Sequence, residues 1–138
     1  MKTEPIDNSA DVLDSRDIIA RIEELQSERD DFEPNEEEGI TWADDNPDEA
    51  AELAALEALA EEASGSPDWL HGETLIRESY FTDYIEELIR DCYEMPKEIT
   101  SGAWPWRHVT VDYEGAAEEA KADYIEVDFD GVTYLIRA

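Results

Sequence analysis

The 138-residue sequence lacks long apolar runs and has almost no cysteine. Cys92 is the single cysteine, so an intramolecular disulfide or a zinc site built from several cysteines is excluded, and nothing indicates an oxidising compartment. The opening residues are polar and acidic rather than apolar, and no stretch has the length of a bilayer-spanning helix. We therefore expect a cytoplasmic protein that does not bind membranes.

Basic residues are also scarce. The chain has 10 Lys and Arg against 39 Asp and Glu, which gives a formal net charge of −29 at pH 7. B-form DNA carries about one negative charge per 1.7 Å of its axis, so nucleic acid would repel this chain and a basic protein would attract it. Apolar residues still make up 41% of the sequence, including 4 Trp. That is enough for a modest core, and we expect the chain to fold.

Two amphipathic helices are predicted in the N-terminal half. Apolar residues at helical spacing predict the first helix over residues 15–32, with Asp14 as its N-cap. The second helix is predicted to follow Asn46 as N-cap, with Glu49 in the capping-box position, and to end after Ala63. We expect the two helices to pair as an antiparallel hairpin.

Two further helices are predicted in the C-terminal half. Between Thr74 and Tyr93, apolar residues form one helical stripe. Cys92 belongs to this stripe, so we expect it to be buried and unreactive. Asp112 is expected to cap a short helix that runs through Ala120.

A β-hairpin is predicted at the end of the sequence. Residues 124–129 and 132–137 flank Asp130-Gly131, a pair that favours a two-residue type I′ turn. In this register six apolar side chains lie on one face of the hairpin. They pair as Phe129 with Val132, Val127 with Tyr134, and Ile125 with Ile136.

These elements predict an α+β fold with an N-terminal helical hairpin, further helices and a C-terminal two-stranded β-hairpin in a small sheet. We expect a loose arm over residues 1–14, followed by one acidic domain over residues 15–138. Within that domain, residues 15–64 form the helical hairpin and residues 65–138 the α+β part.

The acidic residues are arranged in a way that opposes folding. No Lys or Arg lies between Arg29 and Arg77, although that interval contains 16 Asp and Glu. Asp83, Glu87 and Asp91 recur every four residues on a predicted helix, where like charges cost a few tenths of a kcal/mol per pair. Rows of carboxylates at nearly the spacing of phosphates suit the Lys and Arg of a DNA-binding groove.

We therefore predict a non-enzymatic DNA mimic that binds a basic DNA-binding protein of the host. Trp106 is included because an aromatic ring beside acids can hold a partner's arginine through a cation–π contact. The predicted partner-binding residues are Asp83, Glu86, Glu87, Asp91, Asp112, Glu114, Glu118, Glu119, Asp123, Glu126, Asp128, Glu36, Glu37, Glu38, Asp44, Asp45, Asp48, Glu49, Glu52 and Trp106.

The C-terminal part resembles the ArdA-type antirestriction proteins of phages, plasmids and transposons. The resemblance rests on residues 111–114, 116–119, 123–124 and 130–137, and it covers about the last 60 residues. It implies mimicry of B-form DNA that occupies the DNA-recognition subunit of type I restriction–modification enzymes.

The sequence leaves three alternatives to this interpretation open. The target could instead be a CRISPR effector, a uracil-DNA glycosylase or a nucleoid protein. The chain could be a helical adaptor that binds through Ile22, Leu53 and Leu56 and uses its charge only for solubility. The acidity could also be an adaptation to high salt, which predicts unfolding in dilute buffer.

Neither catalysis, a cofactor nor a metal is predicted. His71 and His108 are far apart in the sequence and lack the spacing of a metal site. The acidic segments do not match a calcium-binding EF-hand loop, and no glycine-rich phosphate-binding loop occurs. A second copy of the chain is a further possible partner, because spare apolar surface on the first helix could form a homodimer.

Overall fold

The C-terminal β-hairpin has the predicted turn and register. In the computed structural model, which describes residues 3–33 and 39–138, β3 (Tyr124–Phe129) and β4 (Val132–Arg137) are joined by Asp130 and Gly131. Both turn residues have positive φ, 50° and 88°, as a type I′ turn requires. The six predicted apolar residues pair as expected, which confirms the register.

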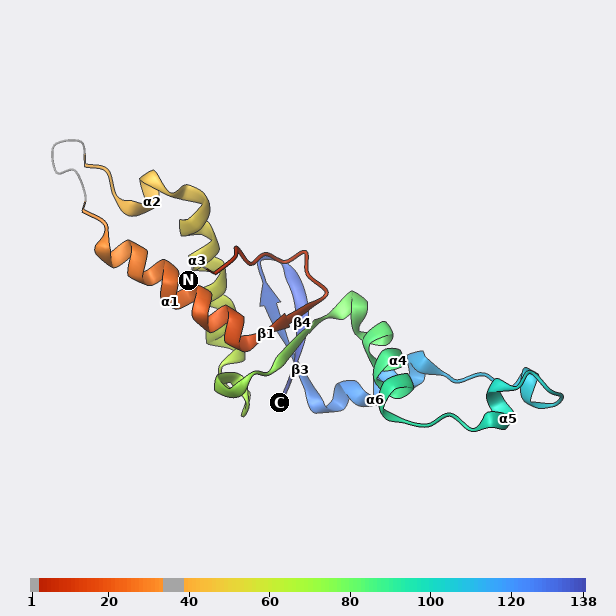
Figure 1. The fold of residues 1–138 in the computed structure, drawn as a ribbon. Coiled ribbons are helices and arrows are strands. Elements are labelled where there is room, and N and C mark those ends of the chain that lie inside the picture. The colour runs from red at the N-terminus through yellow and green to blue at the C-terminus, as the bar shows by residue number, and fades with distance from the viewer. Residues whose placement is uncertain (1–2, 34–38) are drawn as a thin grey trace.

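The hairpin is part of a four-stranded antiparallel sheet with the order β1-β2-β4-β3 (Figure 1). β1 (Val12–Asp14) lies in the segment predicted to be a loose arm. β2 (Thr74–Arg77) occupies the first residues of the stretch predicted as a helix between Thr74 and Tyr93, so that part of the prediction is wrong. The sequence did not predict these two strands because runs of three and four residues are too short to show an alternating pattern.

Both N-terminal helices form and contact each other as a pair. α1 (Ser15–Asp31) begins at Asp14, whose side chain accepts a hydrogen bond from the Arg16 N–H at 2.8 Å, so this N-cap is confirmed. α3 (Pro47–Ala63) has the predicted bounds.

The predicted capping box of α3 is wrong. The Asn46 side chain caps no N–H of α3 and instead donates to the Trp42 carbonyl at 3.1 Å. A capping box does form one helix earlier, between Thr41 and Asp44 of α2 (Trp42–Asp45). Asn46 ends α2 as well as preceding α3, and this double position takes its side chain away from the α3 N–H groups.

The C-terminal half contains α4 (Phe81–Cys92), the one-turn helix α5 (Lys97–Thr100) and α6 (Tyr113–Ala120). The Asp112 side chain caps α6 as predicted, accepting from the Gly115 N–H at 2.9 Å. Short 3-10 turns link the elements. They are η1 (Trp69–His71), η2 (Glu78–Tyr80), η3 (Trp106–His108) and η4 (Lys121–Asp123).

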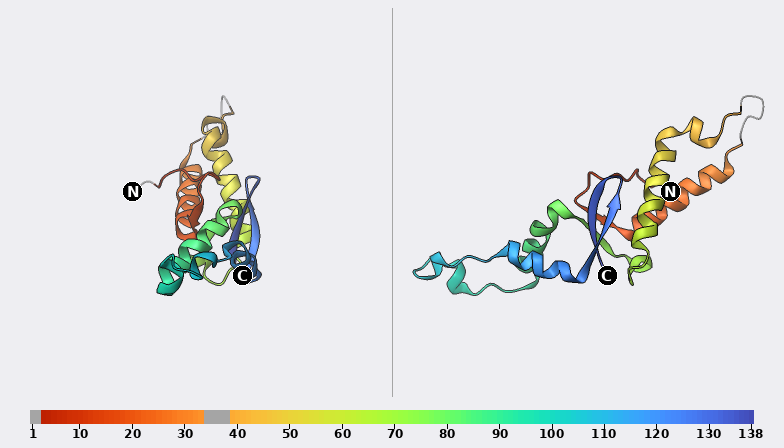
Figure 2. Two further views of the ribbon diagram at one scale, coloured as in Figure 1. Left: turned by 90° about the vertical axis from the view of Figure 1, so that its right-hand side faces the viewer. Right: turned by 180° about the vertical axis from the view of Figure 1, so that it is seen from behind.

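The two faces of the sheet support two separate helical parts. Successive strand residues point to opposite faces. Leu75 and Tyr134 therefore join the core that contains residues of α1 and α3, whereas Ile76 and Leu135 join the core that contains residues of α4 and α6. The helical parts extend in opposite directions from the sheet, so the molecule is elongated (Figures 1 and 2).

Hydrogen bonds hold the N-terminal segment on the body of the molecule. The buried Tyr134 donates its hydroxyl to the Ala10 carbonyl at 2.6 Å, and the Asn8 amide donates to the Asp130 carbonyl at 3.0 Å. The Arg77 N–H donates to the Asp11 carbonyl at 2.8 Å. These contacts bring the first residues across the hairpin near its turn and lead the chain into β1.

Cys92 is exposed, so the expectation that it is buried is wrong. It is the last residue of α4, and the apolar stripe of that helix is buried at Phe81 and Ile85 and only partly buried at Ile89. Leu88, on the same stripe, is also exposed. Among the helices that the structure describes, none has the length and apolar character needed to cross a membrane.

Candidate functional site

An exposed row of three carboxylates lies on α4. Asp83, Glu87 and Asp91 occupy the side of the helix opposite its buried residues Phe81 and Ile85. Within the described residues none of the three is in an ion pair with Lys or Arg. The Tyr80 hydroxyl donates to Glu87 Oε1 at 2.9 Å, and this hydrogen bond raises the pKa of Tyr80. The three carboxylates of this row are therefore accessible from solvent.

Glu86 has a different environment from this row. Its carboxylate lies 2.7 Å from the Arg90 guanidinium, which also lies over the Tyr113 ring at 5.8 Å from the ring centre. The side-chain hydrogen bond with Tyr113 and the charge of Glu86 raise the pKa of Arg90. Arg90 therefore links α4 to the beginning of α6, and its ion pair partly neutralises the charge of Glu86.

The predicted carboxylates of α6, η4 and β3 are all exposed, but three of them have partners. Glu118 lies 3.2 Å from the Lys121 ammonium, and Asp112 caps α6. Asp128 Oδ2 accepts from the Gly131 N–H at 3.3 Å. The others, and Asp128 as well, belong to no ion pair among residues 3–33 and 39–138. These are Glu114, Glu119, Asp123, Glu126 and Asp128.

The two roles of Asp112, helix cap and surface charge, can be separated by substitution. Asp112→Ala is expected to lower the free energy of unfolding by about 1 kcal/mol, because the Gly115 N–H loses its acceptor. Asp112→Asn keeps a side-chain oxygen at the cap and should leave stability nearly unchanged. Urea denaturation followed by circular dichroism measures both. Equal stability of the two variants would contradict the capping role.

The second predicted group lies at the other end of the molecule, on α2 and the beginning of α3. Asp45 and Asp48 are exposed and Glu49 is half-buried. Asp44 accepts the Thr41 N–H at 3.1 Å in the capping box, and the Thr41 hydrogen bonds lower its pKa. The predicted residues Glu36, Glu37 and Glu38 lie outside the described residues.

Glu52 does not belong to an exposed surface. Its two carboxylate oxygens accept from Arg21 Nε at 2.7 Å and Nη2 at 2.8 Å, and the two side chains are only 11% and 8% exposed. Burial raises the pKa of Glu52, but the Arg21 hydrogen bonds, the Ile6 N–H and the Arg21 charge together hold it below its ordinary value. We therefore remove Glu52 from the candidate surface.

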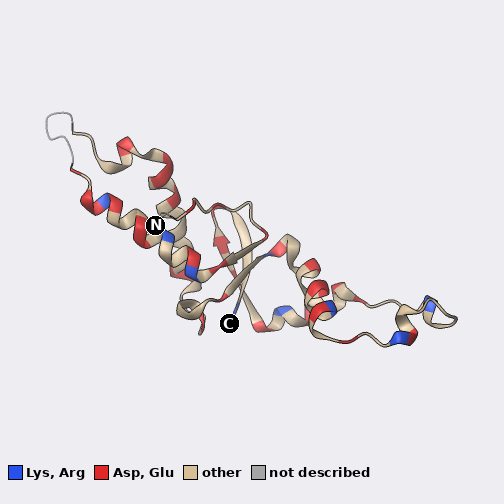
Figure 3. Cartoon of the chain, viewed as in Figure 1, with Lys and Arg blue, Asp and Glu red and all other residues tan. Residues whose placement is uncertain are grey.

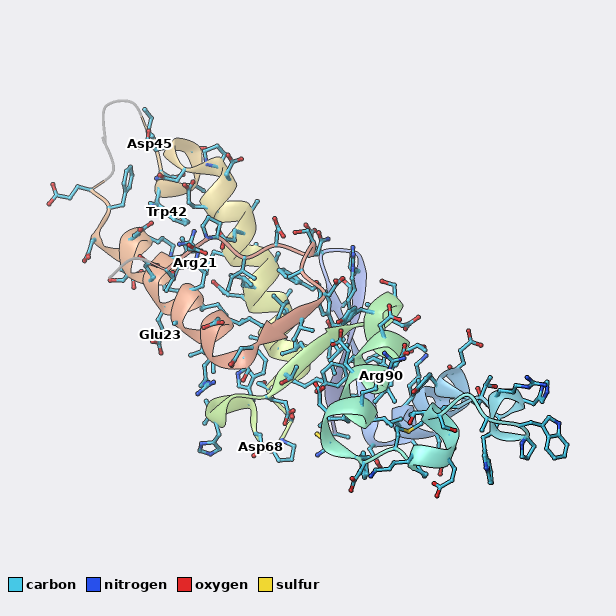
Figure 4. The ribbon with its side chains drawn as sticks, turned by 45° about the vertical axis from the view of Figure 1, so that its right-hand side comes forward. Arg21, Glu23, Trp42, Asp45, Asp68 and Arg90 are labelled. Atoms are coloured by element: carbon cyan, nitrogen blue, oxygen red, sulfur yellow. The ribbon has the colours of Figure 1, made fainter. Side chains whose placement is uncertain are left out.

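Arg21 also fixes the N-terminal segment to α1. Its Nη1 donates to the Thr3 carbonyl at 3.1 Å, and the Thr3 N–H and hydroxyl donate to Glu24. The hydrogen bonds from Thr3 lower the pKa of Glu24. Figure 4 shows Arg21 between α1 and α3, whereas Glu23 and Asp45 point away from the body. Sequence reasoning missed this network because its members are far apart along the chain.

The four tryptophans divide into two buried and two exposed residues. Trp42 and Trp69 are part of the core, whereas Trp106 is 41% exposed and Trp104 is 73% exposed. Trp106, the predicted anchor, is in η3, at the end of the molecule farthest from α2 (Figure 1). Trp104 is more accessible still, and the sequence alone did not distinguish the two.

The candidate acidic surface thus consists of two groups of exposed predicted carboxylates, one on α2 and α3 and the other on α4, α6, η4 and β3. Figure 3 shows Asp and Glu along α3 and α4 and also along α1, whose acids are not part of this surface. In the part of the chain that the structure describes, ion pairs with Lys or Arg involve seven carboxylates. These are Asp14, Glu24, Asp30, Glu52, Glu57, Glu86 and Glu118. The α2–α3 group and the α4–α6 group remain separate, with the sheet between them.

The described residues contain no cluster of three or more His, Cys, Asp or Glu side chains that could hold a metal ion. Four hollows in the described surface are open to solvent, and the predicted residues that line them are Asp48 and Glu52, both in one hollow. Comparisons with protein-family models, with curated proteins and with solved structures found no match.

Proposed function

We propose that the chain is an acidic DNA mimic that binds the DNA-binding groove of a host defence nuclease or restriction–modification complex and thereby excludes DNA. The observation that carries this proposal is the row of exposed carboxylates on α4 of an elongated body, which form no ion pair with any Lys or Arg that the structure describes. A rigid row of anionic groups can replace phosphates in contacts with Lys and Arg. The chain acts by occupying the groove, without catalysis.

The energetic cost of the acidic rows supports a role in binding. Carboxylates at i and i+4 repel each other by a few tenths of a kcal/mol per pair. Among residues 3–33 and 39–138, no Lys or Arg forms an ion pair with the row of Asp83, Glu87 and Asp91. The α4 and α6 helices are nonetheless packed against the sheet through a shared core. A partner rich in Lys and Arg would relieve this repulsion on binding.

The burial of the helical hairpin favours mimicry over an adaptor function. Leu53 and Leu56 are 3% and 0% exposed, and Ile22 packs against the same core. The apolar face of α1 and α3 is therefore occupied by the chain itself. The antirestriction target class follows from the resemblance of residues 111–137, which in the structure are α6, η4 and the hairpin.

A DNA-displacement assay tests the proposal. A fluorescent duplex with its recognition site is bound to a purified type I methyltransferase, and its anisotropy is followed as the chain is added. We expect stoichiometric displacement. Neutralising the α4 row in D83N/E87Q/D91N should weaken binding about tenfold or more, because each substitution removes a charge contact with the groove.

The matched control changes the net charge equally at another place. D17N/E23Q/D31N removes three exposed acids of α1 that lie outside the candidate surface, and it should leave affinity within about threefold of the wild type. Equal loss in both variants would indicate a general charge effect. Amide variants that displace DNA as well as the wild type would contradict mimicry. The same assay with a CRISPR effector or a nucleoid protein distinguishes the target classes.

A further inference from the structure

One end of the molecule differs in character from the rest. Residues 93–111, here named the tip, connect α4 to α6 and contain α5 and η3, which contact each other. Figures 1 and 2 show the tip projecting away from α4 and α6, at the opposite end from α2. Almost every residue of the tip is exposed.

The tip exposes large apolar side chains. Trp104 is 73% exposed, Tyr93 66%, Val109 44% and Trp106 41%. A cluster of exposed aromatic side chains on one short segment is typical of a protein–protein interface. Half of the large apolar residues that are exposed in the described part of the chain lie in this segment.

The tip also carries no net negative charge, in contrast to the body of the molecule. It contains two acids, Glu94 and Glu98, and two bases, Lys97 and Arg107, so its formal net charge is zero in a chain of −29. Within the described residues neither base is in an ion pair, and Arg107 Nε donates instead to the His108 ring at 3.4 Å. Figure 3 shows Lys and Arg, in blue, in the part of the chain around α5 at this end of the molecule.

We propose that the tip is a homodimer interface at which it packs against the tip of a second copy. Two molecules of charge −29 repel each other along their bodies, and the tip is where they can approach without adding like charge. A twofold interface requires a surface that is complementary to itself. Equal numbers of acids and bases beside exposed aromatic rings meet this requirement, since Lys97 and Arg107 of each copy can face the carboxylates of the other.

The structure favours the tip over α1 as the contact between copies. Ile18 and Leu25 of α1 are buried in the chain's own core, and Ile19 and Ile22 pack against it. The dimer through spare apolar surface of α1 that the sequence suggested is therefore not favoured. Tip-to-tip contact leaves the carboxylates of both bodies exposed and directs the two bodies away from each other.

Sedimentation velocity over a range of protein concentrations tests the proposal. We expect the mass to rise from 15.7 kDa toward twice that value as concentration increases. The dissociation constant should fall when NaCl is raised from about 0.05 to about 0.5 M, because salt screens the repulsion between the two bodies. W104A/W106A should raise this constant at least tenfold. The control Leu70→Ala truncates a 74% exposed apolar residue outside the tip and should leave it unchanged.

A second measurement uses the single cysteine. Cys92 is exposed and adjoins the tip, so donor and acceptor dyes attached to it should give energy transfer between copies that W104A/W106A abolishes. A monomer at all concentrations and both salt levels would overturn the proposal. Loss of target binding in W104A/W106A while the wild type stays monomeric would likewise overturn it and assign the tip to the target. Raising the salt concentration should strengthen the dimer but weaken target binding. The two measurements therefore distinguish failure of the dimer proposal from failure of the proposed DNA mimicry.

Discussion

Replacing Arg21 with methionine is expected to lower the free energy of unfolding by about 3–5 kcal/mol. Arg21 is the buried cation that holds α1, α3 and the N-terminal segment together through Glu52 and the Thr3 carbonyl. Without it, the Glu52 carboxylate remains buried without a counterion, and the segment that leads to β1 loses an anchor. Urea denaturation followed by circular dichroism measures the change.

Two further variants distinguish the effect of the buried Arg21–Glu52 pair from the effect of removing any surface charge. Arg16→Ala breaks an exposed ion pair with Asp14, with side chains 66% and 36% exposed, and should cost no more than about 1 kcal/mol. R21M/E52L removes both buried charges and should recover much of the stability lost in R21M, because no uncompensated charge is left. A loss in R21M no larger than in R16A would contradict the role given to the pair.

The Arg21–Glu52 pair also determines how the stability changes as the pH falls. The pKa of Glu52 is lowered in the folded state, so its contribution to stability is complete above the ordinary pKa of a glutamate and is lost as the pH falls through the folded value. R21M/E52L lacks this contribution. Its stability relative to the wild type should therefore improve between about pH 5 and pH 3.

Binding to a basic target is expected to weaken about a thousandfold or more between about 50 and 200 mM salt. This holds if six or more carboxylates replace phosphates, because each contact adds to the slope of affinity against salt. The unpaired carboxylates of α4, α6 and β3 are sufficient in number. Titrations of the target at four salt concentrations give the slope.

The salt titration also tests the remaining explanations of the acidity. Affinity that is independent of salt would contradict mimicry and favour an apolar contact. Circular dichroism in the same dilute buffer provides the control, since a protein adapted to high salt would unfold there whereas a mimic stays folded. D83N/E87Q/D91N should reduce the slope by about two to three.

The elements that the sequence predicted are those whose cause is local. The positive φ angles required at Asp130 and Gly131 fix the hairpin and its register. The apolar period of α1 and the cap at Asp14 fix the first helix. In each case the residues that determine the structure lie within a few positions of one another, so the pattern is readable without knowledge of the fold.

The features that the sequence did not predict depend on distant contacts. β1 is a strand because β2 pairs with it. Glu52 appeared to be one more surface acid, and only the approach of α1 to α3 makes it the partner of Arg21. Cys92 follows the apolar period of α4, but it is exposed because no element of the described fold covers it. Among the acids of the candidate site, sequence could identify charge and spacing but not which carboxylates already had partners.

The position of β3 at the border of the sheet has a consequence for solubility. An unprotected edge strand can pair with another chain and start aggregation. Here the Asp128 N–H already donates to Glu62 Oε2 at 3.1 Å, and the strand carries the exposed carboxylates of Glu126 and Asp128. A second β-strand that approached this border would meet like charge and an N–H group that is already satisfied. Glu62, Glu126 and Asp128 therefore protect this edge of the sheet against the pairing with other chains that would lead to fibrils.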